Sequence, residues 1–442
     1  MSSKASRIPS LSLLAIRSFG WGHLRVVRAA GLNWAIVLLG LGTAQVLPAI
    51  TLIVVARQVL PTMYGQYLAC YSLLSLLIVL PSYGMDAWLL TKGGAERMQV
   101  KSLWLSSLRT RLLFLLVWLL VAVLLALFLP GETFPLAVMV PTALGLAFDA
   151  LGSLSYSAIR ALGHHDQVTV VQAVSSLILL GITLLLPLGA DQVVLFSIVR
   201  AVVSALTALA AIALGLKLGG VEGERLDMRS IVRSARPFMI ADVSVAAYMK
   251  ADLTLVSLFI GAAGASIYGP AINLINMTFL VPNALYLFVL PLLSNAYARS
   301  RISFLRIGAG QLVAHALSGG AISLVIFFGA PLIVQLVFGA AYETSTQALR
   351  LLSLVPFIKA LNFGLGAILT GGGRQSRRTV VQVVCAIFSV SAVLILIVPL
   401  GVFGVALVHT LIEALLFVGY SVVMLYWSMK GKRALVEIAG DA

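Results

Sequence analysis

The chain has 442 residues, of which 61% are hydrophobic and only 10% are charged, and its mean hydropathy is +1.07. Soluble domains contain about 45–50% apolar and about 25% charged residues, so this composition excludes a water-soluble fold and indicates a helical membrane protein. The sequence contains no G-x-x-x-x-G-K-[ST] phosphate-binding loop, which excludes an ATP-hydrolysing motor within the chain.

Twelve apolar stretches follow one another, each long enough to cross a bilayer, which takes about 20 residues. A basic amphipathic segment at 1–32 precedes them and is predicted to lie on the cytoplasmic surface. The predicted spans are 33–55, 66–90, 111–130, 134–159, 168–189, 193–216, 237–260, 266–292, 309–330, 347–370, 379–399 and 402–428. They divide the chain into a first bundle at 33–217, a charged cytoplasmic linker at 218–236, a second bundle at 237–428 and a cytoplasmic tail at 429–442.

The second half of the sequence repeats landmarks of the first. The sequence Thr-Val-Val-Gln begins at Thr169 and again at Thr379, and a Tyr-Gly pair begins at Tyr64 and again at Tyr268. Each half holds an even number of predicted spans, so the halves enter the membrane with the same polarity. The predicted fold is therefore all-α and polytopic, with twelve transmembrane helices in two parallel six-helix bundles around a central cavity.

The basic residues predict the orientation. Residues from Lys92 to Arg111 separate the second predicted span from the third, and most of the other Lys and Arg residues fall in the remaining even-numbered connections and at the ends. Because Lys and Arg collect in cytoplasmic loops, both termini are predicted to be cytoplasmic. This distribution explains the net charge of +15 without a nucleic-acid partner.

Several motifs in the second half resemble those of a known family. They are Lys250-Ala251-Asp252, Tyr268-Gly269-Pro270-Ala271, Gly371-Gly372-Gly373-Arg374-Gln375 and Val398-Pro399-Leu400-Gly401. These motifs resemble the bacterial polysaccharide flippases of the multidrug/oligosaccharidyl-lipid/polysaccharide exporter superfamily. The related lipid II flippases usually have a longer, fourteen-span plan. The resemblance implies a flippase of the bacterial inner membrane that moves polyprenyl-pyrophosphate-linked oligosaccharide by alternating access, for biosynthesis of surface polysaccharide such as lipopolysaccharide or exopolysaccharide.

The resemblance also implies the partners of such a protein. They are the polyprenyl-pyrophosphate-linked glycan, membrane lipid, and polysaccharide polymerase or other assembly proteins. No cofactor and no metal site are expected. The energy source stays open between coupling to H⁺ or Na⁺, the membrane potential and downstream consumption of the product.

Basic residues outside the loops are the first candidates for a substrate site. An unpaired charge at the bilayer centre costs about 2.5–3.5 kcal/mol, so such residues face a cavity or a partner. Ammonium and guanidinium groups are natural receivers of a pyrophosphate. The candidates for a cationic cavity are Lys250, Lys359, Arg200 and Arg57, with Lys250 placed first.

Polar residues within spans are the second group of candidates. Asp149 and Tyr156 belong to one helical stripe, His409 and Glu413 to another, and polar stripes in lipid must face protein or water. The full set for a polar cavity or ion coupling is Asp149, Tyr156, Asp242, Asp252, Asn273, Asn276, Asn362, His409 and Glu413. A structural alternative stays open, in which a carboxylate neutralises a lysine and the amides only join helices.

Two other functions compete with a flippase. A cation-coupled drug or metabolite exporter of the same superfamily should have an acidic cavity, so the sign of the cavity charge separates it from a flippase. A membrane-embedded glycan polymerase or glycosyltransferase needs a catalytic carboxylate or base at the membrane surface, often on a large loop. The predicted outer loops are short and contain few carboxylates, so the protein is not expected to be an enzyme.

Overall fold

The computed structural model describes residues 42, 46–186, 192–218 and 226–440, and the regular elements in these ranges are all helices. The predicted amphipathic segment at 1–32 lies outside the described residues. The start of the first predicted span and part of the predicted linker also lie outside them.

The first half begins with the helix Val46–Gln58. Its further helices are α2 (Pro61–Leu77), α3 (Val79–Ser82), α4 (Met85–Ala95), η2 (Arg97–Gln99), α5 (Val100–Phe128), α6 (Leu136–Ala161), α7 (His165–Leu185) and α8 (Gln192–Leu218). Those of the second half are α9 (Met228–Phe259), α10 (Gly261–Thr278), α11 (Leu280–Arg299), α12 (Arg301–Val337), η3 (Ala340–Tyr342), α13 (Ser345–Leu352), α14 (Val355–Gly371) and α15 (Gln375–Gly440).

Nine helices in the described part are long and apolar enough to cross a membrane, so the chain is an all-helical membrane protein. The other predicted spans fall on a short helix, on a helix with several charged residues, and on helices that are joined to a neighbouring helix. Val46–Gln58 is short, and α9 carries Asp242, Lys250 and Asp252 along its 32 residues. The last two predicted spans both lie in α15, which consists of two helices joined by a kink at Gly401, where the backbone is not helical (φ 56°, ψ −141°).

The second predicted span, 66–90, is not one straight helix in the structure. It consists of α2, α3 and α4, and the chain breaks between α3 and α4 at Tyr83 and Gly84, where φ is 50° and 66°. Glycine takes such a left-handed conformation without the steric cost that a side chain adds. The break turns α4 away from α2 and brings Asp86 to the first turn of α4.

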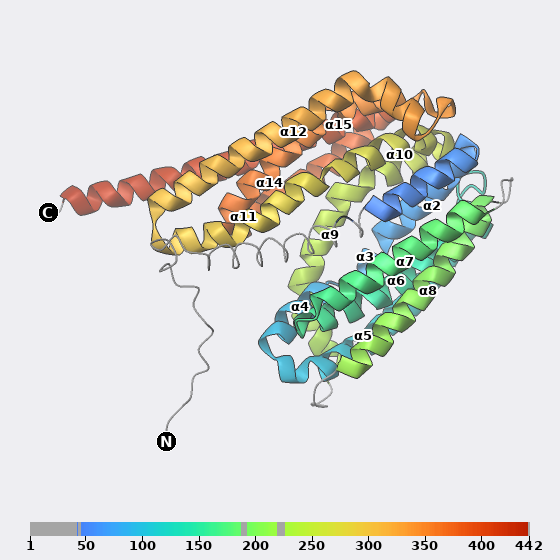
Figure 1. Ribbon diagram of the computed structural model, residues 1–442, viewed down its shortest axis with the longest axis horizontal. Helices are drawn as coiled ribbons and strands as arrows, with labels where there is room; N and C mark the ends of the chain where they lie inside the picture. The colour runs from blue at the N-terminus through green and yellow to red at the C-terminus, as the bar shows by residue number, and fades with distance from the viewer. Residues whose placement is uncertain (1–41, 43–45, 187–191, 219–225, 441–442) are drawn as a thin grey trace, which may run out of the picture.

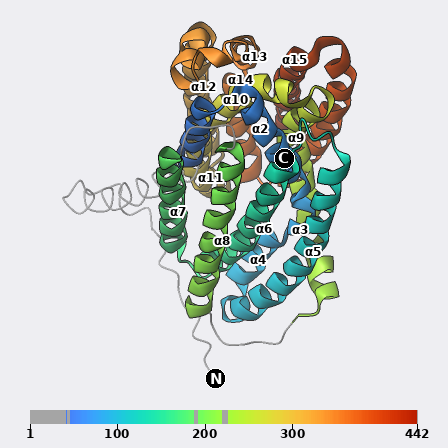
Figure 2. The same ribbon diagram turned by 90° about the vertical axis from the view of Figure 1, so that its right-hand side faces the viewer.

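The helices of each half pack mainly on one another. In the first half α6 packs against α8, α5 and α4, and in the second half α14 packs against α12, α15 and α11. Figure 1 shows the first half in blue to green and the second in yellow to red, with α9 running between them. Figure 2 shows the same division from the side, with α5 to α8 below and α12 to α15 above.

The two halves meet where α2 packs against α10 and α9. The Tyr-Gly pairs of the repeat lie in this contact, because Gly65 faces the backbone of Ala262 and Gly269 faces the side chain of Leu68. A Cβ atom at Gly65 would collide with the carbonyl oxygen of Ala262, so glycine permits the close approach of the two helices. Tyr64 and Tyr268 are both fully buried beside it.

A second contact joins the halves near η3. The Tyr342 hydroxyl donates to the carbonyl of Ala56 at 3.0 Å, and Arg57 donates to the carbonyl of Leu336. The ring of Tyr342 also meets that of Tyr64 edge-on, with 6.0 Å between centroids. Burial raises the pKa of Tyr342 above its ordinary value, so the hydroxyl stays protonated and remains a donor.

Removing this hydroxyl should weaken the contact between the halves. We expect Tyr342→Phe to lower the fraction of molecules in which the two halves touch near η3 by up to about fivefold. A buried hydrogen bond is worth about 1 kcal/mol net, which corresponds to about this factor. Pulsed electron resonance between spin labels at the exposed positions Leu60 and Glu343 measures that fraction. Tyr297→Phe, at an exposed tyrosine, is the control, and equal distance distributions in both variants would contradict the expectation.

Candidate functional site

A central cavity of about 490 Å³ lies where the two halves face each other. Its walls come from Val46–Gln58 and α2 on one side and from α9, α10, α11 and α14 on the other. The polar side chains that line it are Lys250, Asn273, Asn276 and Asn283, and aromatic rings of Tyr64, Tyr71, Phe279 and Phe363 complete the wall. None of the described lining residues is acidic.

Local helix geometry places these polar groups together. Asn273 and Asn276 are three residues apart on α10, which sets them on one helix face. Lys250 reaches the cavity from α9, and its Nζ donates to the backbone carbonyl of Ser75 on α2 at 3.2 Å. Its side chain is exposed rather than enclosed in the helix packing. The structure thus brings three of the predicted residues, Lys250, Asn273 and Asn276, to one cavity.

Lys359 makes a different kind of contact. Its Nζ lies 2.7 Å from Oε1 of Glu413, and both side chains are buried between α14 and α15. Asn362 donates to the other carboxylate oxygen of Glu413 at 2.8 Å and to its backbone carbonyl at 3.0 Å. Lys359 does not line the central cavity, although its Nζ is 5.3 Å from the ring centroid of Phe279, which does. This cluster matches the structural alternative of a lysine neutralised by a carboxylate.

A second buried cluster surrounds Asp252. Its Oδ2 accepts from the Tyr268 hydroxyl at 2.6 Å and lies 3.0 Å from Nδ1 of His409. The cluster joins α9, α10 and α15. Nε2 of His409 is buried without a hydrogen-bond partner among the described atoms. Asp252 and Lys250, two residues apart on α9, therefore contact different neighbours.

Arg200 and Asp149 form an ion pair in the first half, with 2.9 Å between NH2 and Oδ2. The guanidinium also lies over the ring of Tyr71, 4.9 Å from its centroid. The pair borders a smaller cavity of about 330 Å³ between α6, α7 and α8, which Tyr156 also lines. Tyr71 also lines the central cavity, and Pro48 lines both cavities, so this first-half cluster adjoins the central cavity.

The two remaining predicted residues, like those of the Lys359 and Asp252 clusters, line neither cavity. Arg57 is exposed and donates to Leu336 at the contact near η3. Asp242 lies on α9 and is partly exposed. Neither residue contacts the cavity that Lys250 lines.

The most buried charge in the described part was missed by the sequence prediction, which placed Arg111 at a loop boundary. The structure instead starts α5 at Val100, and Arg111 is completely buried within it. Its guanidinium binds both carboxylate oxygens of Asp86 at 3.0 and 2.8 Å and donates to the carbonyls of Ser82 and Ala150. The carboxylate of Asp86 inside an apolar stretch was the signal that an arginine partner was needed.

Comparison with solved structures places this fold among membrane transporters. "Lipid II flippase MurJ, inward closed conformation" aligns with a TM-score of 0.73 and 13% identity over 89% of this chain and 87% of that chain. "Inward-facing conformation of a multidrug resistance MATE family transporter of the MOP superfamily" aligns with a TM-score of 0.68 and 12% identity over 88% and 94%. A MOP superfamily transporter from Pyrococcus furiosus aligns with a TM-score of 0.60 and 13% identity over 90% and 94%.

The fold of this chain is therefore the fold of these MOP-superfamily transporters. Residues 30–296, more than half of the sequence, match the family described as "Polysaccharide biosynthesis protein". The chain belongs to this family. A search of curated protein sequences finds no significant match.

The Arg111–Asp86 pair should be essential for the stability of the first half. We expect Arg111→Gln to lower the free energy of unfolding by about 3 kcal/mol, because it leaves a partly buried carboxylate without its counter-charge. Thermal unfolding of the detergent-purified protein measures the change. Arg109→Gln removes an exposed arginine from the same helix and should leave the melting temperature almost unchanged. Equal melting temperatures for the two variants would contradict this assignment.

Proposed function

We propose that this chain flips polyprenyl-pyrophosphate-linked oligosaccharide across the bacterial inner membrane by alternating access, for surface polysaccharide biosynthesis. In this proposal twelve spans form two parallel six-helix bundles, at 33–217 and 237–428, around the central cavity, and both termini lie in the cytoplasm. The family and the transporter fold support the general class. The cavity supports the class of substrate.

The observation that carries the proposal is the chemistry of the cavity wall. Lys250 offers a single ammonium group for a pyrophosphate, whose oxygens accept strong, charge-assisted hydrogen bonds. Asn273, Asn276 and Asn283 offer both donors and acceptors, which suits sugar hydroxyls. Rings such as that of Phe363 add apolar surface beside these polar groups. A wall of this composition fits an anionic, hydroxyl-rich headgroup.

The same wall argues against export of cationic compounds. A carrier of cations needs negative charge at its binding surface, and no acidic residue lines the described part of the central cavity. The nearby carboxylates have partners of their own, since Asp149 pairs with Arg200 and Glu413 pairs with Lys359. The sign of the cavity charge thus favours the flippase over the exporter.

Ion coupling is assigned in this proposal to the Asp252 cluster. Asp252 and His409 form a carboxylate–imidazole contact of 3.0 Å between two helices, and an imidazole can both accept and donate a proton. Their helices, α9 and α15, also form one of the main contacts within the second half. The proposal leaves the coupling ion open between H⁺ and Na⁺. The membrane potential and downstream consumption of the product are the alternative energy sources.

Removing the charge of Lys250 tests the proposed substrate class. We expect Lys250→Ala to lower delivery of lipid-linked glycan to the outer leaflet by about tenfold, because a hydrogen bond to a charged group is worth about 1.5–3 kcal/mol. Lys250→Arg should retain most of the delivery, since it keeps the charge. Delivery is measured in the host bacterium at matched protein levels.

The control for this experiment is Lys217→Ala, at an exposed lysine near the end of α8. It removes the same charge from a position outside the cavity and should leave delivery unchanged. Unchanged delivery in Lys250→Ala would overturn the assignment of an anionic substrate to the central cavity.

A further inference from the structure

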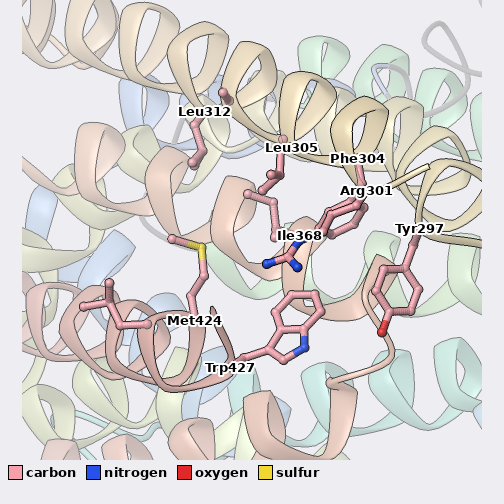
Figure 3. A pocket seen from close by; sticks show the side chains of 11 residues that line it. Tyr297, Arg301, Phe304, Leu305, Leu312, Ile368, Met424 and Trp427 are labelled. Atoms are coloured by element: carbon pink, nitrogen blue, oxygen red, sulfur yellow. The ribbon is translucent and has the colours of Figure 1, made fainter. Parts of the chain in front are cut away.

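The second half contains a separate pocket of about 470 Å³, which shares no lining residue with the central cavity (Figure 3). It lies between the first turns of α12, the side of α14 and the last membrane-length part of α15. Apart from Arg301, the Tyr297 hydroxyl and the indole N–H of Trp427, its side chains are apolar. The proposed transport cycle makes no use of this pocket.

Three aromatic rings form one wall of the pocket. The ring centroids of Phe304 lie 5.3 Å from Tyr297 and 5.9 Å from Trp427, and those of Tyr297 and Trp427 are 5.8 Å apart. Each ring therefore contacts the other two, and the cluster joins α11, α12 and α15. Packing of this kind fixes the shape of the wall before any ligand binds.

Arg301 is the charged group of the pocket. It is the first residue of α12, and Figure 3 shows its guanidinium pointing into the pocket, towards Met424 and Trp427. Its side chain is exposed and forms no ion pair with a side chain that the structure describes. A guanidinium held over an apolar floor matches a ligand with one anionic group and a hydrocarbon part.

The pocket opens on a face that lipid must cover. Leu305 and Leu425 at its edges are each 58% exposed, and Val313 and Leu317 continue the exposed apolar surface along α12. In a membrane protein such a surface lies against acyl chains, and an apolar pocket is a poor site for water. The occupant that meets both the apolar lining and the guanidinium is a membrane lipid.

We propose that this pocket is a binding site for an anionic glycerophospholipid. The phosphate is received by Arg301, and one acyl chain lies along Phe304, Gly308 and Leu312 towards Met424. A lipid bound here sits on the outer flank of the second half and is not the molecule in transit through the central cavity. It ties the beginning of α12 to the end of α15 and so holds the second half together during transport.

The site can be tested with Trp427 as an internal reporter. The full-length protein is reconstituted into vesicles of phosphatidylcholine, and phosphatidylglycerol with brominated acyl chains is added. Bromine quenches indole fluorescence at contact. The fluorescence of Trp427 is the difference between the unmodified protein and Trp427→Phe, and lipid binding in the pocket should quench this difference. The concentration of brominated phosphatidylcholine that gives the same quenching should be about tenfold higher, because phosphatidylglycerol carries a net negative charge and accepts a stronger, charge-assisted hydrogen bond.

Two variants and one control decide the outcome. Arg301→Gln should raise the phosphatidylglycerol needed for half-quenching by about tenfold, and Gly308→Leu, which fills the pocket, should abolish the difference between the two lipids. Arg306→Gln removes an exposed arginine of the same helix that does not line the pocket and should leave quenching unchanged. Equal quenching by both lipids in the unmodified protein, or equal loss in Arg301→Gln and Arg306→Gln, would overturn the proposal.

A competition experiment distinguishes a phospholipid from a polyprenyl phosphate as the ligand of this pocket. Undecaprenyl phosphate should compete with brominated phosphatidylglycerol no better than unbrominated phosphatidylglycerol does. Much stronger competition would assign the pocket to the transported lipid carrier and would contradict the proposal. The outcome is independent of the Lys250 experiment, because no residue is shared between the two sites.

Discussion

The cost of an unpaired charge in a membrane determines how this protein is held together. The two buried Lys and Arg side chains of the described part, Arg111 and Lys359, each pair with a carboxylate on a neighbouring helix. The close contacts between acidic and basic side chains in these ranges are Arg111–Asp86, Arg200–Asp149 and Lys359–Glu413, together with the contact of His409 with Asp252. All four join helices within one half of the chain. Lys250 differs, because among the described residues its ammonium group donates to a backbone carbonyl and to no carboxylate, and it faces the cavity.

The contacts between the halves are of a weaker kind. Lys250, Arg57 and Tyr342 each donate across the interface, and each donates to a backbone carbonyl rather than to a carboxylate. Hydrogen bonds between membrane helices are worth about 0.6–2 kcal/mol, whereas breaking a buried ion pair costs about 3–5 kcal/mol. This difference suits two rigid bodies that change their relative position while their own packing is retained.

Hydropathy and charge predicted the helical class and most of the helix positions, because both depend on residues close in the sequence. They did not predict the pairing of charges, since Asp86 and Arg111, or Lys359 and Glu413, meet only through tertiary packing. A charged residue at the edge of an apolar stretch was taken as the end of the membrane span. Arg111 was therefore assigned to a loop, although it lies buried inside α5. The break at Tyr83 and Gly84 was also missed, because an apolar run of this length gives no local signal for it. Lys250, Asn273 and Asn276 could be selected from sequence because each is a polar group within a predicted span.

The central claim is that Lys250 faces a water-filled cavity while Ala246 and Ala251 on the same helix, α9, are buried. Reaction of single cysteines with a water-soluble thiol reagent tests this most directly, in a chain whose buried Cys70 and Cys385 are replaced. Lys250→Cys and Asn276→Cys should react readily and be protected by lipid-linked glycan, and Ala246→Cys, one turn away on α9 and buried, should not react. An unreactive Lys250→Cys, or equal reaction at position 246, would contradict this account.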